Sequence, residues 1–226
     1  MKKLILTLVS CAMVFGLAAQ QPVKDFAKCY RYAKANAELT QKPVVVFMGD
    51  SITEGWYEKH AEFFTDNNFA GRGISGQTSW EMLLRFRADV INLQPKAVVI
   101  LAGTNDVAQN KGPMTYQQTL DNIISMVELA KAHKIKVVLC AILPADRFGW
   151  RPNIQPAQHV IETNKLIKAY ADENKIPYVD YHALLDNGKG GLSKEHAPDG
   201  IHPVAGAYSL MEAEVMKTLS KVVKLK

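Results

Sequence analysis

Short apolar segments alternate with longer amphipathic ones along most of this chain. The apolar segments are continuous and rich in β-branched residues. They predict buried strands at residues 44–48, 97–101 and 137–142, a weaker strand at 178–181 and a short one at 68–70. Strands that are apolar at every position, rather than at every second one, are typical of a parallel sheet covered on both faces.

The amphipathic segments between these strands predict helices over residues 24–39, 79–93, 116–133, 157–174 and 205–223. In the third of these helices one apolar stripe recurs at helical spacing and can face a core: Leu120, Ile123, Ile124 and Val127. The alternation of strands and helices predicts a three-layer α/β/α sandwich with a mainly parallel, five-stranded sheet and right-handed crossovers.

The first 20 residues have a different pattern. Lys2 and Lys3 precede an almost uncharged apolar run over residues 4–17, which gives way to small residues before Gln20. Such a segment is typical of a secretory signal peptide, and its apolar run is shorter than the roughly 18 residues of a membrane span. We therefore expect a signal peptide at residues 1–20 and a secreted or periplasmic protein. Because the apolar run continues past Cys11, lipoprotein anchoring is not expected.

Composition limits the function without defining it. Hydrophobic residues make up 48% and charged residues 22% of the 226 residues, as in ordinary globular proteins, and residues 21–226 are predicted to form one domain. The formal net charge is +5, but the basic residues are scattered, apart from a C-terminal set that fits a solvated helix face better than a nucleic-acid site: Lys217, Lys221, Lys224 and Lys226. Beyond the leader, Cys29 and Cys140 do not make a disulfide framework, and two buried free thiols are expected.

Ser51 is the first candidate for chemistry. It lies in the sequence GDSIT (residues 49–53), just after the strand at 44–48. It is therefore expected at the carboxyl end of a strand and the start of a helix, where backbone N–H groups can assist a nucleophile. The alternative is that Ser51 only caps the helix. Thr53 replaces the last glycine of the G-x-S-x-G elbow, which excludes the α/β-hydrolase superfamily.

Two further segments could complete a serine-dependent site. Asp199 and His202 lie three residues apart, a spacing that lets a carboxylate fix the tautomer of a histidine base. Alternatively, Asp199 caps the last helix and His202 is solvated. Asn105 follows the strand at 97–101, where its amide could donate to an oxyanion, or residues 103–106 could form a simple Asn/Asp turn.

The glycines at residues 71–76 match G-x-G-x-x-G letter for letter. A dinucleotide site also needs a strong preceding strand and an acidic residue about 20 positions later. The chain instead has a poor strand at 65–70, and Lys96 lies 20 positions after Gly76. We therefore expect these glycines to allow close backbone approach, with the Gly76 N–H as an oxyanion donor.

The joint order of these motifs is more specific than any one of them. Gly-Asp-Ser, Ile-Ser-Gly-Gln-Thr, Gly-Thr-Asn-Asp and Asp-x-x-His follow one another between residues 44 and 202, an order that resembles the SGNH (GDSL-like) hydrolases. The segment around Ser51 is most similar to platelet-activating-factor acetylhydrolase-like and carbohydrate acetylesterase-like members. The resemblance implies a flavodoxin-like fold, with Ser51 as nucleophile and His202 as general base. It also implies Asp199 as the residue that orients His202, and an oxyanion hole formed by the Ser51 N–H, the Gly76 N–H and the Asn105 amide.

We therefore expect a serine esterase for short acyl groups, especially acetyl, carried on carbohydrate, with no cofactor. A lysophospholipase or thioesterase for longer chains is the alternative on the same fold. The candidate substrate contacts are Asp50, Trp56, Arg147 and Trp150. The last two lie in the proline-rich segment 144–156, which predicts a long loop at the catalytic end of the sheet.

Two alternatives lie outside esterase chemistry. A metal site could use the cluster of His182, Glu195, His196, Asp199 and His202, although these residues lack a regular ligand spacing, and no metal is expected. A secreted carbohydrate-binding module could use four aromatic side chains: Trp56, Tyr57, Trp80 and Trp150. All five positions of the hydrolase constellation are occupied, which argues against a binding-only descendant.

Overall fold

The computed structural model describes residues 25–225, so the predicted signal peptide and its cleavage site lie outside the described residues. Within this range five strands form one sheet: β1 (Val45–Gly49), β2 (Phe69–Gly73), β3 (Ala97–Leu101), β4 (Lys136–Cys140) and β5 (Tyr178–Val179). The order is β2-β1-β3-β4-β5, and every pairing is parallel. This is the strand order of flavodoxin-like sheets, so the predicted fold class is confirmed.

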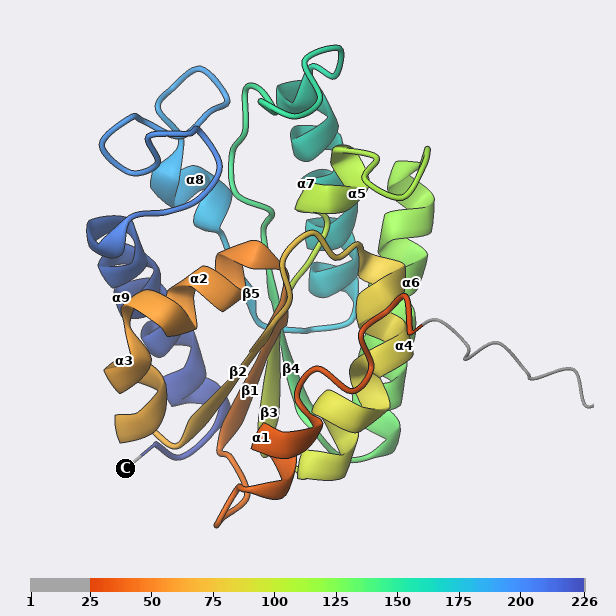
Figure 1. Ribbon diagram of the computed structural model, residues 1–226, viewed down its shortest axis with the longest axis vertical. Coiled ribbons are helices and arrows are strands. Elements are labelled where there is room, and N and C mark those ends of the chain that lie inside the picture. The colour runs from red at the N-terminus through yellow and green to blue at the C-terminus, as the bar shows by residue number, and fades with distance from the viewer. Residues whose placement is uncertain (1–24, 226) are drawn as a thin grey trace, which may run out of the picture.

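Helices cover both faces of the sheet (Figure 1). One layer contains α4 (Ser79–Asp89), α5 (Thr104–Val107), α6 (Tyr116–Ala132) and α7 (Pro156–Glu173). The other contains α2 (Ser51–Lys59), α3 (Ala61–Asp66), α8 (Tyr181–Leu185) and α9 (Ala205–Val222). No helix within residues 25–225 combines the length and apolar character needed to cross a membrane.

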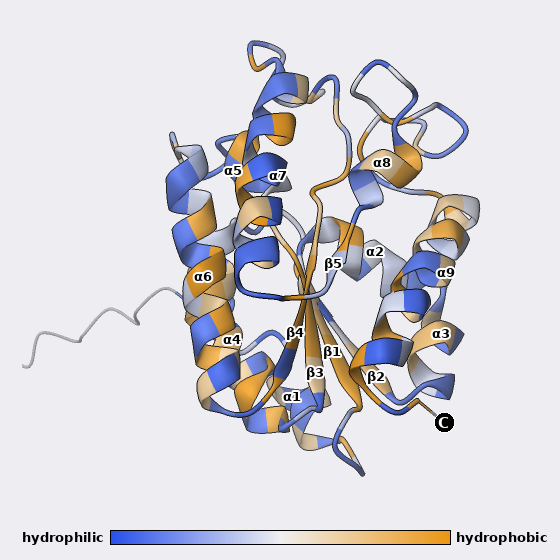
Figure 2. Cartoon of the chain, turned by 180° about the vertical axis from the view of Figure 1, so that it is seen from behind, coloured by the Kyte–Doolittle hydropathy of each residue, from blue (hydrophilic) through white to orange (hydrophobic). Residues whose placement is uncertain are grey.

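The two helical layers explain why the strands are apolar at every position. Along β1, Val46 and Met48 pack against the layer that contains α4, whereas Val45 and Phe47 pack against the layer that contains α2. Successive side chains of a strand point to opposite faces, so a strand between two layers must be apolar on both. The central strands accordingly appear as apolar ribbons between the helices (Figure 2).

The structure departs from the predicted elements at several places. The strand expected at 178–181 ends at Val179, because Tyr181 begins α8, and the helix expected at 79–93 ends at Asp89. Of the helix expected over residues 24–39, only α1 (Ala33–Ala37) forms in the described part. Turns precede α1, and in one of them the Asp25 carboxylate accepts the Cys29 N–H at 2.8 Å. The short strand expected at 68–70 instead continues as β2 through Gly73, because this segment pairs with β1 over five residues.

The two cysteines are free thiols, as expected. Cys140 is buried in β4, whereas Cys29 lies in the turn segment and is half-buried, so the expectation of burial is confirmed for Cys140 alone.

Candidate functional site

The nucleophile candidate Ser51 is the first residue of α2, immediately beyond the carboxyl end of β1. The helix is capped by Asp50, whose Oδ1 accepts the Ile52 N–H at 3.0 Å. The alternative that Ser51 serves as the cap is therefore wrong. Its hydroxyl is available for another partner, and it lies at the positive end of the helix dipole.

His202 is that partner. Its Nε2 lies 3.0 Å from Ser51 Oγ, and its Nδ1 lies 2.7 Å from Asp199 Oδ2. The other oxygen of Asp199 accepts the N–H groups of Ile201 and His202 at 2.9 and 2.8 Å, which closes a tight loop. The alternative that Asp199 caps the last helix is wrong, because Val204 occupies the cap position of α9.

The electrostatics of this loop favour a charged Asp199. Partial burial raises the pKa of Asp199, but hydrogen bonds from the His202 N–H, the imidazole and the Ile201 N–H outweigh it, so that the pKa lies below its ordinary value. An ionised carboxylate favours the His202 tautomer that carries its proton on Nδ1. In that tautomer the lone pair of Nε2 faces the Ser51 hydroxyl, which is the arrangement that a general base requires.

Neighbouring strands bring the oxyanion candidates to the same edge of the sheet. The loop with Gly76 follows β2, Ser51 follows β1 and Asn105 follows β3, and these three strands are adjacent. Gly76 has φ +78°, in the region that favours glycine. Among residues 25–225, neither the Ser51 N–H nor the Gly76 N–H has a hydrogen-bond acceptor. Both are therefore unengaged donors at the edge that holds Ser51.

The amide of Asn105 is already engaged. Its Nδ2 donates to Asp50 Oδ2 at 3.1 Å and to the carbonyl oxygen of Gln77 at 3.0 Å. An oxyanion can therefore bind this amide only by sharing or replacing one of these acceptors. Asp50 is 1% exposed, and burial raises its pKa to about 6. The structure thus places Asp50 beneath the site, as a support for Asn105 and α2, and its predicted contact with substrate is wrong.

The GDSL-like lipase/acylhydrolase family model matches residues 47–210 of the chain. The chain belongs to this family. It is 49% identical to the GDSL-like lipase of Bacteroides thetaiotaomicron, with a TM-score of 0.83 over 88% of this chain and 100% of that one. It is 29% identical to Esterase TesA of Pseudomonas aeruginosa over 80% of this chain and 91% of TesA. It is also 33% identical to the uncharacterized lipoprotein YqeF of Bacillus subtilis, in an alignment that covers 67% of this chain and 61% of YqeF. The chain is accordingly a carboxylic ester hydrolase.

In this GDSL-like hydrolase a further residue, Asn110, reaches the candidate oxyanion amide. Asn110 Nδ2 donates to Asn105 Oδ1 at 2.5 Å, and Asn110 Oδ1 accepts the indole N–H of Trp150 at 2.8 Å. Trp150 is 45% exposed, whereas Phe148 beside it in the loop is buried. Phe148 therefore pins the loop, and Trp150 remains available on its surface. Asn110 lies in no sequence motif that would have indicated its role. That role depends on the 144–156 loop, which brings Trp150 to Asn110 only in the folded structure.

The remaining predicted contacts separate into two groups. Arg147 is exposed, and its guanidinium lies against Gly200, inside the loop that carries Asp199 and His202. Trp56 is 1% exposed and donates its indole N–H to Glu212 at 2.8 Å, so its predicted contact with substrate is wrong. Trp56 lies one helical turn after Ile52, on the face of α2 that is turned to the core.

The structure does not assemble the alternative metal site. Among residues 25–225, no group of three or more His, Cys, Asp and Glu side chains is arranged to hold a metal ion. Two of the proposed ligands contact each other instead: His202 Nδ1 faces Asp199, and His202 Nε2 faces Ser51. Of the aromatic residues considered for sugar stacking, Tyr57, Trp80 and Trp150 are exposed.

Proposed function

We propose that this ester hydrolase is a secreted serine esterase that removes short acyl groups, especially acetyl, from carbohydrate. The observation that carries the proposal is the continuous hydrogen-bonded line from Ser51 through His202 to Asp199, with separations of 3.0 and 2.7 Å. We further propose that residues 1–20 form a signal peptide and residues 21–226 one hydrolase domain. Mass spectrometry of protein from the culture medium or periplasm should then show a chain that begins near residue 20.

The proposed reaction is acyl transfer in two steps. His202 Nε2 accepts the proton of Ser51 Oγ as this oxygen attacks the ester carbonyl, and the N–H groups of Ser51 and Gly76 receive the resulting oxyanion together with the Asn105 amide. The carbon–oxygen bond to the alcohol then breaks, and the alcohol leaves with the proton from His202. Water attacks the acyl-serine by the same route in reverse and releases the carboxylic acid.

The 144–156 loop supports the carbohydrate part of the proposal. The indole of Trp150 is partly exposed, and its N–H donates to Asn110, which in turn donates to the Asn105 amide oxygen. Aromatic faces stack against the apolar faces of sugar rings, and the Arg147 guanidinium beside Gly200 offers hydrogen bonds to hydroxyl groups. The loop would therefore bind the alcohol side of the ester, while Ser51 receives the acyl side.

Ser51→Ala tests the nucleophile. The variant should hydrolyse p-nitrophenyl acetate at the background rate and should not react with a fluorophosphonate probe. Ser125→Ala, at a partly exposed position on α6, is the matched control and should behave as the wild type. Retained turnover or labelling in folded Ser51→Ala protein would exclude Ser51 as the nucleophile.

A series of p-nitrophenyl esters from acetate to palmitate tests the acyl preference. We expect kcat/KM to fall as the chain lengthens. Higher kcat/KM for octanoate and longer chains than for acetate would favour a lysophospholipase or thioesterase. Trp150→Ala should raise KM for an acetylated oligosaccharide more than for p-nitrophenyl acetate, because the smaller substrate offers little surface to the loop. Equal changes for the two substrates would contradict a sugar-binding role for the loop.

A further inference from the structure

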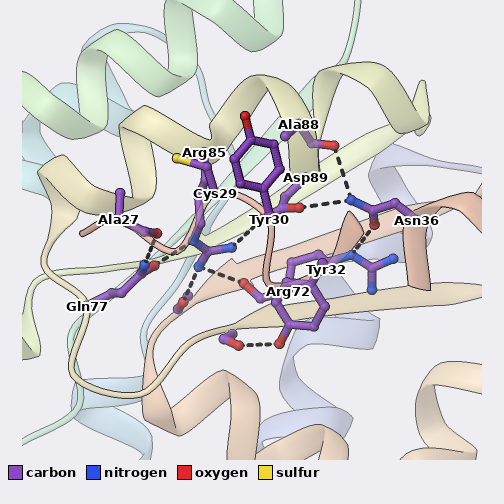
Figure 3. Close-up of polar contacts among 12 residues, drawn as sticks. Ala27, Cys29, Tyr30, Tyr32, Asn36, Arg72, Gln77, Arg85, Ala88 and Asp89 are labelled. Atoms are coloured by element: carbon purple, nitrogen blue, oxygen red, sulfur yellow. Dashed lines mark hydrogen bonds and ion pairs between the residues drawn. The ribbon is translucent and has the colours of Figure 1, made fainter. Parts of the chain in front are cut away.

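Arg85 lies behind the site with its side chain fully buried on α4. Its guanidinium donates four hydrogen bonds (Figure 3). Two go to side chains, Asp89 Oδ2 at 2.9 Å and Gln77 Oε1 at 2.5 Å. The other two go from Nη2 to the backbone carbonyl oxygens of Gly49 and Arg72, each at 2.9 Å. A buried charge is costly to desolvate, and well-packed apolar side chains often stabilise a core equally well. Its four directed bonds therefore indicate a geometric role for Arg85.

The two carbonyl acceptors lie at the carboxyl ends of neighbouring strands. Gly49 ends β1 two residues before Ser51, and Arg72 is the penultimate residue of β2. Beside them β2 packs directly on the first turns of α2, since a Cβ at Gly73 would lie 2.1 Å from the backbone nitrogen of Glu54. A shift of either strand end would therefore also move the start of α2, which carries Ser51.

The third acceptor, Gln77, belongs to the oxyanion loop itself. It directly follows Gly76, and its carbonyl oxygen accepts the Asn105 amide at 3.0 Å. Its side-chain oxygen accepts from Arg85 at the same time. Together with the carbonyl at the end of β1, Gln77 thus connects the guanidinium to all three groups of the proposed oxyanion hole.

Residues 25–37 form hydrogen bonds with the partners of Arg85. Gln77 Nε2 donates to the carbonyl oxygen of Ala27 at 2.6 Å. Asn36 Nδ2 donates to Asp89 Oδ1 at 2.9 Å, and Asn36 Oδ1 accepts from Arg72 Nε at 2.8 Å (Figure 3). Residues 25–37 therefore hold both side-chain acceptors of Arg85, Gln77 and Asp89, in place.

We propose that Arg85 is a positioning residue for ester hydrolysis, which sets the distance between the turn that carries Ser51 and the loop that carries Gly76. The inference rests on the proposed function, because it takes the N–H groups of these two residues as oxyanion donors. Arg85 acts through Gln77 and the ends of the strands. A lysine cannot replace it, because an ammonium group lacks the rigid fork that reaches separated acceptors at once.

Two variants test the proposal with p-nitrophenyl acetate. Arg85→Lys keeps the charge beside Asp89, and Gln77→Met keeps Arg85 while removing the contact to the loop. Each should lower kcat by about 10- to 100-fold and change KM by less than about threefold, because a displaced oxyanion donor weakens binding of the transition state alone. Arg87→Lys, on the exposed face of the same helix, is the matched control and should leave both constants unchanged.

A trifluoromethyl ketone distinguishes positioning from a loss of stability. The reagent forms a tetrahedral adduct with a serine nucleophile, so its inhibition constant should rise in each variant by the factor by which kcat/KM falls. A kcat within about twofold of the wild type in folded Gln77→Met protein, or an unchanged inhibition constant, would overturn the proposal. If Arg85→Lys does not fold, Gln77→Met decides. Wild-type activity in Gln77→Met beside inactive Ser51→Ala would refute this inference alone, whereas active Ser51→Ala would refute the proposed function as well.

Discussion

Replacing Asp199 with asparagine should impair catalysis more than replacing it with alanine, although asparagine has nearly the same shape. One Asp199 oxygen accepts two backbone N–H groups at 2.8 and 2.9 Å, and the other faces His202 Nδ1 at 2.7 Å. An asparagine has a single side-chain oxygen, which the two N–H groups would retain. Its NH2 group would then donate to Nδ1, and the ring would carry its proton on Nε2, where Ser51 requires a base.

The size of the effect follows from these contacts. Turning the asparagine amide around would restore the productive tautomer but leave two backbone N–H groups facing a donor, at about 1 kcal/mol each in this partly exposed loop. The productive arrangement is thus disfavoured by about 2 kcal/mol, or about 30-fold. In Asp199→Ala, water can accept from Nδ1–H because the His202 side chain is 41% exposed. We expect kcat to fall about 10²-fold in Asp199→Ala, and about 10³-fold in Asp199→Asn because the unproductive tautomer adds to the lost charge.

The assay is the kcat for p-nitrophenyl acetate of both variants, with a urea unfolding curve for each to show that the protein remains folded. Asp172→Asn, at an exposed carboxylate on α7, controls for the loss of one negative charge and should have wild-type kcat. An asparagine variant as active as the alanine variant, or more active, would refute the tautomer argument.

Further predictions concern the groups around Asn105 and the thiols. Asn105→Ala should lower kcat by about 10²–10³-fold in a protein that calorimetry shows to be folded, and undiminished kcat would remove this amide from the oxyanion hole. Asn110→Ala should lower kcat by about tenfold through the lost donor to Asn105, while unchanged kcat would show that the amide needs no such support. For Asp50, burial raises the pKa from 3.8 to about 6, so ionisation opposes folding; the cost is absent below about pH 4 and complete above about pH 6. The unfolding free energy of Asp50→Asn minus that of the wild type should therefore rise by about 3 kcal/mol between about pH 4 and pH 7 in urea titrations, and a flat difference would contradict the raised pKa. Cys140 is buried whereas Cys29 is half-buried, so in the proposed domain of residues 21–226 a thiol reagent should label Cys29 alone when the protein is folded and both residues in guanidinium chloride; fast native labelling of Cys140 would contradict its burial.

The strands of this fold can be predicted from the sequence for a local reason. A strand between two helical layers must be apolar on both faces, so residues 97–101 and their counterparts in β1 and β4 are marked by their own composition. The carboxyl ends of parallel strands lie at the same edge of the sheet. A polar motif directly after such a strand is therefore expected at that edge. Ser51 and Asn105 could be located in this way.

Other features depend on neighbours that are distant in the sequence. The segment around Gly71 and Gly73 has poor strand propensity, and it becomes β2 only because β1 offers a parallel partner over five residues. Trp56 lies near Ser51 in the sequence, but the helical turn directs it into the core. Proximity in sequence to a nucleophile therefore does not predict contact with its substrate.

Periodicity and motifs within single segments are enough to predict the class of fold, the chemical types of the candidate catalytic groups and the strand ends that carry two of them. How these groups meet depends on tertiary contacts. The tertiary structure brought His202 to 3.0 Å from Ser51 across 151 positions of chain and placed Asn110 behind Asn105. It also buried Arg85 between the ends of β1 and β2. Contacts of this kind arise when the α2 and α4 layers close on the sheet, and no single segment records that geometry.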